Sequence, residues 1–137
     1  MRELKFRIWI KDEGRFYDES DDESYLIVPN GNVIYESGAY EEDGEFFRDT
    51  TNQTSNVIVE QYTGLRDKNG KEIYDGDIVE YDYGFGTYVV TYRRYDASFV
   101  LEDDNREEII KLVLAGHPFY EVIGNIHENP ELLEGEE

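Results

Sequence analysis

The sequence feature that most constrains the fold is a series of short β-type runs separated by glycine turns between Val57 and Tyr92. Asn69-Gly70 predicts a type I′ hairpin turn because both residues tolerate positive φ, and Gly76 interrupts the return strand. The Tyr83–Gly86 stretch predicts a further turn because it holds two glycines. The predicted strands are Val57–Gln61, Ile78–Tyr81 and Thr87–Tyr92. We therefore expect a β-meander with glycine turns.

The N-terminal segment alternates apolar and polar residues from Leu4 to Ile10. Because side chains alternate between the two faces of a strand, one face is predicted to be core and the other to carry Lys5, Arg7 and Trp9. The predicted core residues are Leu4, Phe6, Ile8 and Ile10. Lys11–Gly14 is predicted as a turn and Arg15–Tyr17 as a short return strand.

A second hairpin is predicted from Tyr25–Val28 and Val33–Glu36, with Asn30-Gly31 at its turn. From Ser37 to Asn56 the apolar content falls, which predicts a long irregular connection. The alternative is an ordered arm whose paired phenylalanines, Phe46 and Phe47, dock on a neighbouring protein. We favour the flexible connection.

Beyond the meander, Ser98–Leu101 predicts another strand and Phe119–His127 the closing strand, with Gly124 at a bulge or a tight barrel corner. Residues 105–115 fit either a short helix or a buried strand because their apolar residues are too dense for an amphipathic stripe. The fold class expected is mainly β, β-rich α+β at most, with a small SH3-like barrel-type C-terminal part.

The length of 137 residues fits a single domain, residues 1–137, that can bury a core without disulfides. The expected subdivision is N-terminal hairpins over 1–36, an irregular connection over 37–56, a barrel-like part over 57–133 and an acidic tail over 134–137. There is no cysteine, and no apolar stretch is long enough to predict a signal peptide or membrane span. We expect a cytoplasmic protein.

The net charge of −20, from 33 acidic and 13 basic residues, repels nucleic-acid phosphate. Direct nucleic-acid binding is therefore disfavoured, and a basic partner is favoured if the charge does more than solvate the surface. The acidic run Asp18–Ser24 lacks the glycine and ligand spacing of a calcium loop, so it predicts a solvated loop.

Two long motifs resemble the YopX family of bacteriophage and prophage proteins: QYTGLRDKNGKEIYDGDIV, Gln61 to Val79, and EVIGNIHENPELL, Glu121 to Leu133. The opening RELKFRIW, Arg2 to Trp9, is similar as well. The resemblance implies a mainly β fold and a phage origin; it implies no established activity and hence no catalytic residues. The motif residues expected to have structural roles are Gln61, Tyr62, Thr63, Gly64, Leu65, Gly70, Gly76, Asp77, Gly124, Asn129 and Pro130.

Residues able to carry catalysis are few. Glu72, Asp75 and Asp77 could act as acid and base or hold magnesium, but carboxylates beside glycine turns more simply accept backbone N–H bonds. Only two histidines are present, and no serine elbow or phosphate loop. We therefore expect that the protein is not an enzyme and that it binds no cofactor or metal ion.

Aromatic residues are the other candidates for contact. Trp9, Tyr83, Phe85 and Tyr88 could form an exposed recognition surface, or pack as ordinary cross-strand pairs and small satellite cores.

The leading hypothesis is a small acidic, phage-encoded binding or assembly module that acts through protein contacts and forms homo-oligomers, with an unknown protein partner. The alternatives are a DNA-mimicking or host-inhibitory protein, and a metal-dependent hydrolase that uses Glu72, Asp75 and Asp77.

Overall fold

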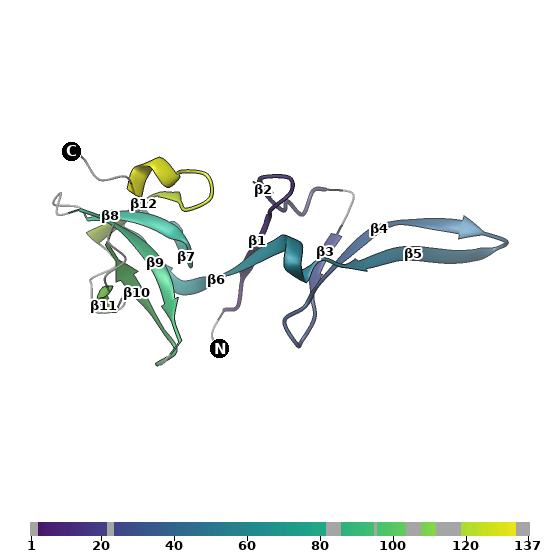
Figure 1. Cartoon of the computed structure of the whole chain (residues 1–137), viewed down its shortest axis with the longest axis horizontal. Helices are drawn as coiled ribbons and strands as arrows, with labels where there is room; N and C mark the ends of the chain where they lie inside the picture. Colours follow the sequence, from purple (N-terminus) through teal and green to yellow (C-terminus); the bar gives the residue numbers. More distant parts are fainter. Residues whose placement is uncertain are drawn as a thin grey trace. The chain divides into compact units, whose positions relative to one another are not determined.

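In a computed structural model the chain is mainly β, as predicted (Figure 1). The structure describes residues 3–21, 24–81, 86–94, 96–103, 108–111 and 119–133. Its strands are β1 (Phe6–Ile10), β2 (Arg15–Phe16), β3 (Ser24–Ile27), β4 (Val33–Glu42), β5 (Glu45–Asn52), β6 (Val57–Arg66), β7 (Glu72–Tyr74), β8 (Asp77–Tyr81), β9 (Thr87–Arg93), β10 (Ser98–Glu102), β11 (Glu108–Lys111) and β12 (Tyr120–Asn125). Short 3-10 turns follow β5 at Thr54–Asn56 and β12 at Pro130–Leu133.

The chain divides into two compact units. Unit 1 comprises Met1–Phe6 and Glu60–Glu137, and unit 2 is the continuous segment Arg7–Val59. The chain therefore passes between the units twice, once in β1 and once in β6. These two strands are neighbours in a sheet of order β2-β1-β6-β7.

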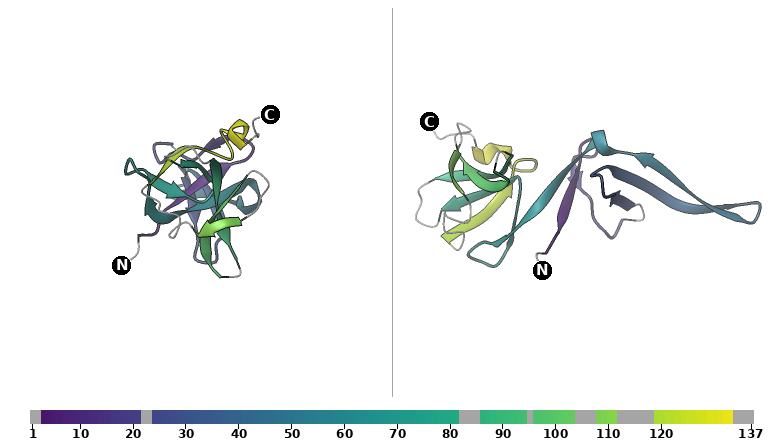
Figure 2. Two further views of the ribbon diagram at one scale, coloured as in Figure 1. Left: turned by 90° about the vertical axis from the view of Figure 1, so that its left-hand side faces the viewer. Right: turned by 90° about the horizontal axis from the view of Figure 1, so that it is seen from below.

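Unit 1 is built around an antiparallel five-stranded sheet of order β11-β10-β9-β8-β12, which curls on itself (Figure 2). Strands β8, β9 and β10 follow one another as a meander. The predicted meander is only partly right: its strands Ile78–Tyr81 and Thr87–Tyr92 are neighbours, but its first strand, Val57–Gln61, is part of β6 and lies in another sheet. Alternating side chains from β8, β9 and β10, together with β7 and β12, form one apolar core. Its buried members are Ile73, Val79, Val90, Leu101, Tyr120 and Val122.

The turn that joins β6 to β7 differs in detail from the predicted type I′ geometry. The Gly70 N–H donates to Asp67 O at 3.0 Å, which places Lys68 and Asn69 at the turn centre. Gly70 has φ +81°, whereas Asn69 is not among the described residues with positive φ. This is a type I turn followed by a left-handed glycine. Asp67 selects it, because Oδ1 of Asp67 accepts the Asn69 N–H at 2.9 Å.

The bulge predicted at Gly124 is present. The β12–β8 register shifts between Val122 and Gly124, so that Gly124 lies opposite Ile78. A Cβ on Gly124 would lie 2.5 Å from Oδ1 of Asn129. Glycine at this bulge thus allows the chain after β12 to fold back against the strand.

Unit 2 has its own small core of Ile8, Val33 and Val57, with Tyr17, Tyr25 and Val59 packed against it. The alternation predicted for β1 holds for Ile8 and Ile10, which are buried. Leu4 and Phe6 were also predicted to be core residues, and this prediction is wrong because they are 59% and 46% exposed. These two residues precede unit 2, so the apolar alternation continues beyond the core that it serves.

The irregular connection predicted for residues 37–56 is wrong for most of its length. Strand β4 continues to Glu42, and β5 returns antiparallel beside it (Figure 1). Low apolar content indicated a loop, but a two-stranded ribbon with both faces in water also needs few apolar residues. Its threonines and aromatic residues favour strands.

For residues 105–115 the sequence fitted either a helix or a strand. The structure has a strand, β11, over Glu108–Lys111, and it pairs antiparallel with β10. Residues 104–107 and 112–118 lie outside the described residues.

Candidate functional site

The most exposed apolar surface of unit 2 lies on the ribbon formed by β4 and β5. Asp43 and Gly44 form its two-residue loop, with φ of +54° and +80°, and Glu42 pairs with Glu45 across it. Positive φ at both positions is the type I′ geometry, which matches the natural twist of a hairpin. The Asp43-Gly44 pair was the sequence signal for this ribbon, and our sequence analysis missed it.

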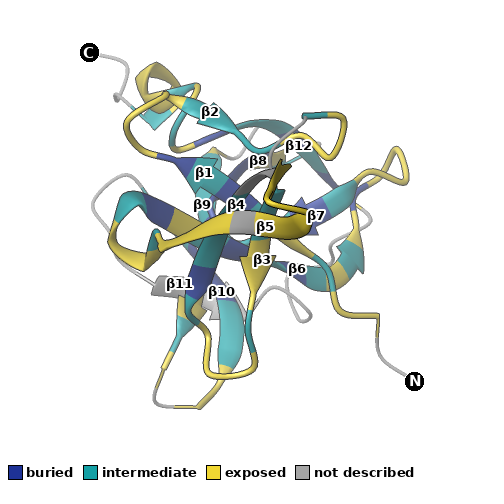
Figure 3. Cartoon of the chain, turned by 90° about the vertical axis from the view of Figure 1, so that its right-hand side faces the viewer, coloured by how far each residue is buried: buried dark blue, intermediate teal, exposed yellow. Residues whose placement is uncertain are grey.

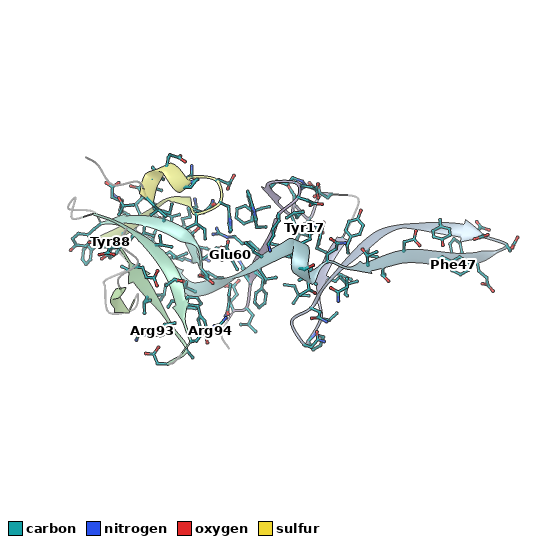
Figure 4. The ribbon with its side chains drawn as sticks, in the orientation of Figure 1. Tyr17, Phe47, Glu60, Tyr88, Arg93 and Arg94 are labelled. Carbon is teal, nitrogen blue, oxygen red and sulfur yellow. The ribbon has the colours of Figure 1, made fainter. Side chains whose placement is uncertain are left out.

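Three aromatic side chains are exposed near the end of the ribbon. Phe46 is 80% exposed, Tyr40 43% and Phe47 39%. Tyr40 and Phe47 (Figure 4) are cross-strand partners whose rings stack, with centroids 5.6 Å apart. Phe46 is the next residue along β5, so its side chain lies on the opposite face of the ribbon. Both faces of the ribbon therefore present an aromatic residue to solvent.

The ribbon is also acidic. Residues 37–52 contain one basic residue, Arg48, and five acidic ones. The acidic residues are Glu41, Glu42, Asp43, Glu45 and Asp49. Glu42 and Glu45 lie directly opposite each other, an arrangement that repels in an isolated hairpin.

The base of the ribbon is fixed to the core of unit 2. Buried Val33, at the start of β4, accepts the Gln53 N–H at 2.8 Å and donates its own N–H to Thr54 Oγ1 at 3.0 Å. Asn52 Oδ1 in turn accepts the N–H of Thr54 at 2.9 Å. An ordered base of this kind holds the exposed end of the ribbon as a defined structure.

Phe46 and Phe47 were considered in the sequence as docking residues of an ordered arm, and the structure places them on this ribbon. The four aromatic residues proposed as an exposed recognition surface lie elsewhere in the chain. Trp9 is half-buried and packs edge-on against Phe16 at 4.9 Å between centroids, within the β1–β2 hairpin. Tyr88 is half-buried in unit 1, 6.3 Å from the Tyr120 ring (Figure 4). The pKa of the Tyr120 hydroxyl is raised, chiefly because the side chain is buried and to a lesser extent because Tyr88 and Tyr81 lie nearby. Tyr83 and Phe85 lie outside the described residues.

The three carboxylates considered for metal-dependent chemistry serve different purposes. Glu72 accepts a hydrogen bond from Lys5 Nζ at 2.8 Å, which, with a further bond to Glu3, raises the pKa of Lys5. Asp77 is buried, and its Oδ2 accepts the Tyr74 N–H at 2.7 Å. The Asp75 N–H donates to Gln61 O at 3.0 Å. Among the described residues no group of three or more histidine, cysteine, aspartate or glutamate side chains is arranged to hold a metal ion.

A buried polar pair not anticipated from the sequence joins β6 to the segment after β12. Oε2 of Glu60, which is 3% exposed, lies 3.1 Å from Nε2 of His127. Gly76 lies against this carboxylate, and its carbonyl accepts the Ile126 N–H at 3.0 Å. No local pattern in the sequence predicts this pairing, because the two residues are far apart in the chain.

The first long motif is used to shape β6 and its turn. Buried Tyr62 packs against Tyr74, and Thr63 Oγ1 donates to Ile73 O at 2.7 Å. Gly64 has φ +88° where the β6–β7 register shifts, and Leu65 packs against the core of unit 1. These residues therefore have structural contacts.

The two long motifs meet through Asp67. Its Oδ2 accepts the Val122 N–H at 2.9 Å, while its Oδ1 accepts the N–H groups of Asn69 and Lys71. The Lys68 N–H also donates to Tyr120 O at 2.9 Å. After β12, Asn129 Oδ1 accepts the Asn125 N–H at 3.2 Å, and Pro130 begins the 3-10 turn. The motif residues thus hold the β6–β7 turn against β12.

Comparison with known proteins connects this arrangement to a family. The family described as YopX protein matches residues 5–134. The chain belongs to the YopX family. Among solved structures, protein EF1440 from Enterococcus faecalis is 27% identical, with a TM-score of 0.63 over 98% of this chain and 100% of that one.

Protein yopX from Bacillus subtilis is 22% identical, with a TM-score of 0.56 over 98% of this chain and 100% of that one, and shows a shared fold. No curated protein matches the sequence. No helix among the described residues is long and apolar enough to cross a membrane. The residues of the two long motifs take part in the contacts that build unit 1.

Proposed function

We propose that this YopX-family chain is a protein-binding module whose contact surface is the end of the β4–β5 ribbon. The observation that carries the proposal is the exposure of Tyr40, Phe46 and Phe47 on an ordered hairpin that needs none of them for a core. Aromatic residues have large contact areas and few rotatable bonds, and they are enriched in the energetic centres of protein interfaces.

Besides its exposed aromatic residues, the ribbon has an ordered base and an exposed strand, both of which suit a binding surface. At its base Val33 donates its N–H to Thr54 Oγ1, so binding would cost less ordering entropy than docking of a disordered loop. Figure 3 shows β5 exposed along most of its length.

Site-specific photocross-linking tests this proposal. A benzophenone amino acid at Phe46 would be irradiated in lysates of Enterococcus faecalis and Bacillus subtilis, the organisms of two solved relatives. We expect discrete covalent adducts that disappear when Phe47→Ser is added. Adducts to a second copy of the chain would identify self-association as the binding mode.

The matched control carries the same amino acid at Leu26, an exposed apolar residue of the same three-stranded sheet but outside the ribbon. Equal adduct patterns from positions 26 and 46 would contradict a ribbon-directed contact. A nucleic-acid-binding protein captured in both cases, and unaffected by Phe47→Ser, would favour the DNA-mimicry hypothesis instead.

A further inference from the structure

Strand β5 lies at the edge of its sheet, where a further strand could pair with it. In the three-stranded sheet β3-β4-β5, the only strand paired with β5 in the described part of the chain is β4. A long edge strand without proline presents unpaired backbone donors and acceptors to any extended segment that approaches it. This consideration rests on the proposed function and specifies the chemistry of its partner.

The register identifies the backbone groups that face outward. Glu42 and Glu45 close a two-residue loop, so they exchange backbone hydrogen bonds with each other. Hydrogen-bonded and non-hydrogen-bonded pairs alternate along antiparallel strands. Phe46, opposite Glu41, and Arg48, opposite Ala39, therefore direct their backbone N–H and C=O groups away from β4.

Charge selects the strand that this edge can accept. Residues 37–52 of each ribbon carry five carboxylates and one guanidinium, so two copies brought edge to edge would repel. Glu45 and Phe47 lie on one face of β5, and Phe46 lies on the other face. An incoming strand with cationic side chains opposite the carboxylates would gain cross-strand attraction and relieve the repulsion between Glu42 and Glu45.

We propose that β5 binds an extended, lysine- or arginine-rich segment of another protein as an additional strand, with Phe46 and Phe47 contacting its apolar side chains. The backbone bonds supply affinity without regard to sequence, and the alternating charges and rings supply selectivity.

A synthetic peptide provides the test. A fluorescent peptide of roughly ten residues that alternates lysine with valine and threonine would be titrated with the full chain. We expect binding that weakens between about 50 and about 300 mM NaCl, and no binding of the same peptide with glutamate in place of lysine. Equal binding of both peptides would overturn the charge argument.

The strand-addition geometry has its own matched pair of variants. Arg48→Pro removes an outward N–H, whereas Arg48→Ala removes the same guanidinium but keeps that N–H. We expect Arg48→Pro to weaken peptide binding about three- to tenfold relative to Arg48→Ala, as for one lost hydrogen bond. Circular dichroism would verify that both variants fold.

N-methylation of alternate peptide amides tests the same bonds without altering the protein, so the proposal stays testable if Arg48→Pro unfolds. Undiminished binding of the methylated peptide would exclude strand addition. If Phe46 cross-linking then still depends on Phe47, the ribbon remains a contact surface and only the β5 strand-addition mode is rejected.

Discussion

Gly76 and the carboxylate of Glu60 are in such close contact that a Cβ at position 76 would lie 2.0 Å from Glu60 Oε2. Gly76 also has φ +90°, a backbone conformation that L side chains rarely adopt. Glu60 cannot move aside freely, because it is buried and bonded to His127. Space and backbone geometry therefore both require glycine here.

Gly76→Ala should consequently destabilise the protein more than Gly70→Ala. Both changes place a side chain at positive φ, at a cost of about 1–2 kcal/mol, but nothing lies within 4 Å of a Cβ at Gly70. Displacing Glu60 from His127 should add about 1–3 kcal/mol at Gly76. Urea unfolding would give both free energies. Equal losses would mean that Glu60 yields at little cost.

Gly70→Val tests the β6–β7 turn. Valine at φ +81° should cost about 1–3 kcal/mol in strain, enough to lower the melting temperature by several degrees. Lys68→Val at the turn centre is the control, since its backbone N–H to Tyr120 is kept, its φ is not positive, and its ion pair with Glu121 is long and near the surface. Calorimetric melting that shows the two variants alike would refute the observed turn geometry.

Asp67→Ala should loosen the contact between this turn and β12. The change leaves the Val122 N–H, now bonded to Asp67 Oδ2, without an acceptor in a buried place. Together with the two turn bonds, the loss should be about 2–4 kcal/mol. Amide hydrogen exchange followed by NMR should show the largest loss of protection at Val122. Asp96→Ala, at an exposed ion pair with Arg93, is the comparison and should leave Val122 protected.

Phe46→Ser should leave stability nearly unchanged, within about 0.5 kcal/mol, because its side chain is largely in solvent. Val33→Ala, at the base of the same ribbon, removes a fully buried side chain and should cost about 2 kcal/mol. Thermal melts of the two variants would show whether the fold uses Phe46. A large loss for Phe46→Ser would mean that the phenylalanine is a packing residue.

Local chemistry in the sequence was sufficient to predict the β8–β9 pair, the Asn30-Gly31 hairpin and the bulge at Gly124. It did not show that β6, predicted as the first strand of the same meander, belongs to another sheet. It was insufficient at Asn69, because glycine-containing hairpin turns share a composition and the Asp67 side chain decided between them. The ribbon was missed for a different reason. Polarity was interpreted as absence of structure, although Asp43-Gly44 is itself a hairpin signal.

The pairing of Glu60 with His127 could not be predicted from either segment alone. It depends on β12 lying beside β8, which brings the residues after Asn125 to the Gly76 turn. The surface aromatic residues were also ambiguous in sequence. Trp9 and Phe46 were both predicted for strands or arms with polar residues nearby, but Trp9 packs against Phe16 whereas Phe46 is 80% exposed.

The insertion of unit 2 between the two segments of unit 1 imposes an order on folding during synthesis. Unit 2 is continuous and can close once Val59 has left the ribosome, whereas β8 must wait for β12. At about 5–20 residues per second, this delay lasts roughly 3–15 s. During that interval the ribbon is already available to a partner while the five-stranded sheet still lacks its last strand, so a nascent chain could be captured before its synthesis is complete.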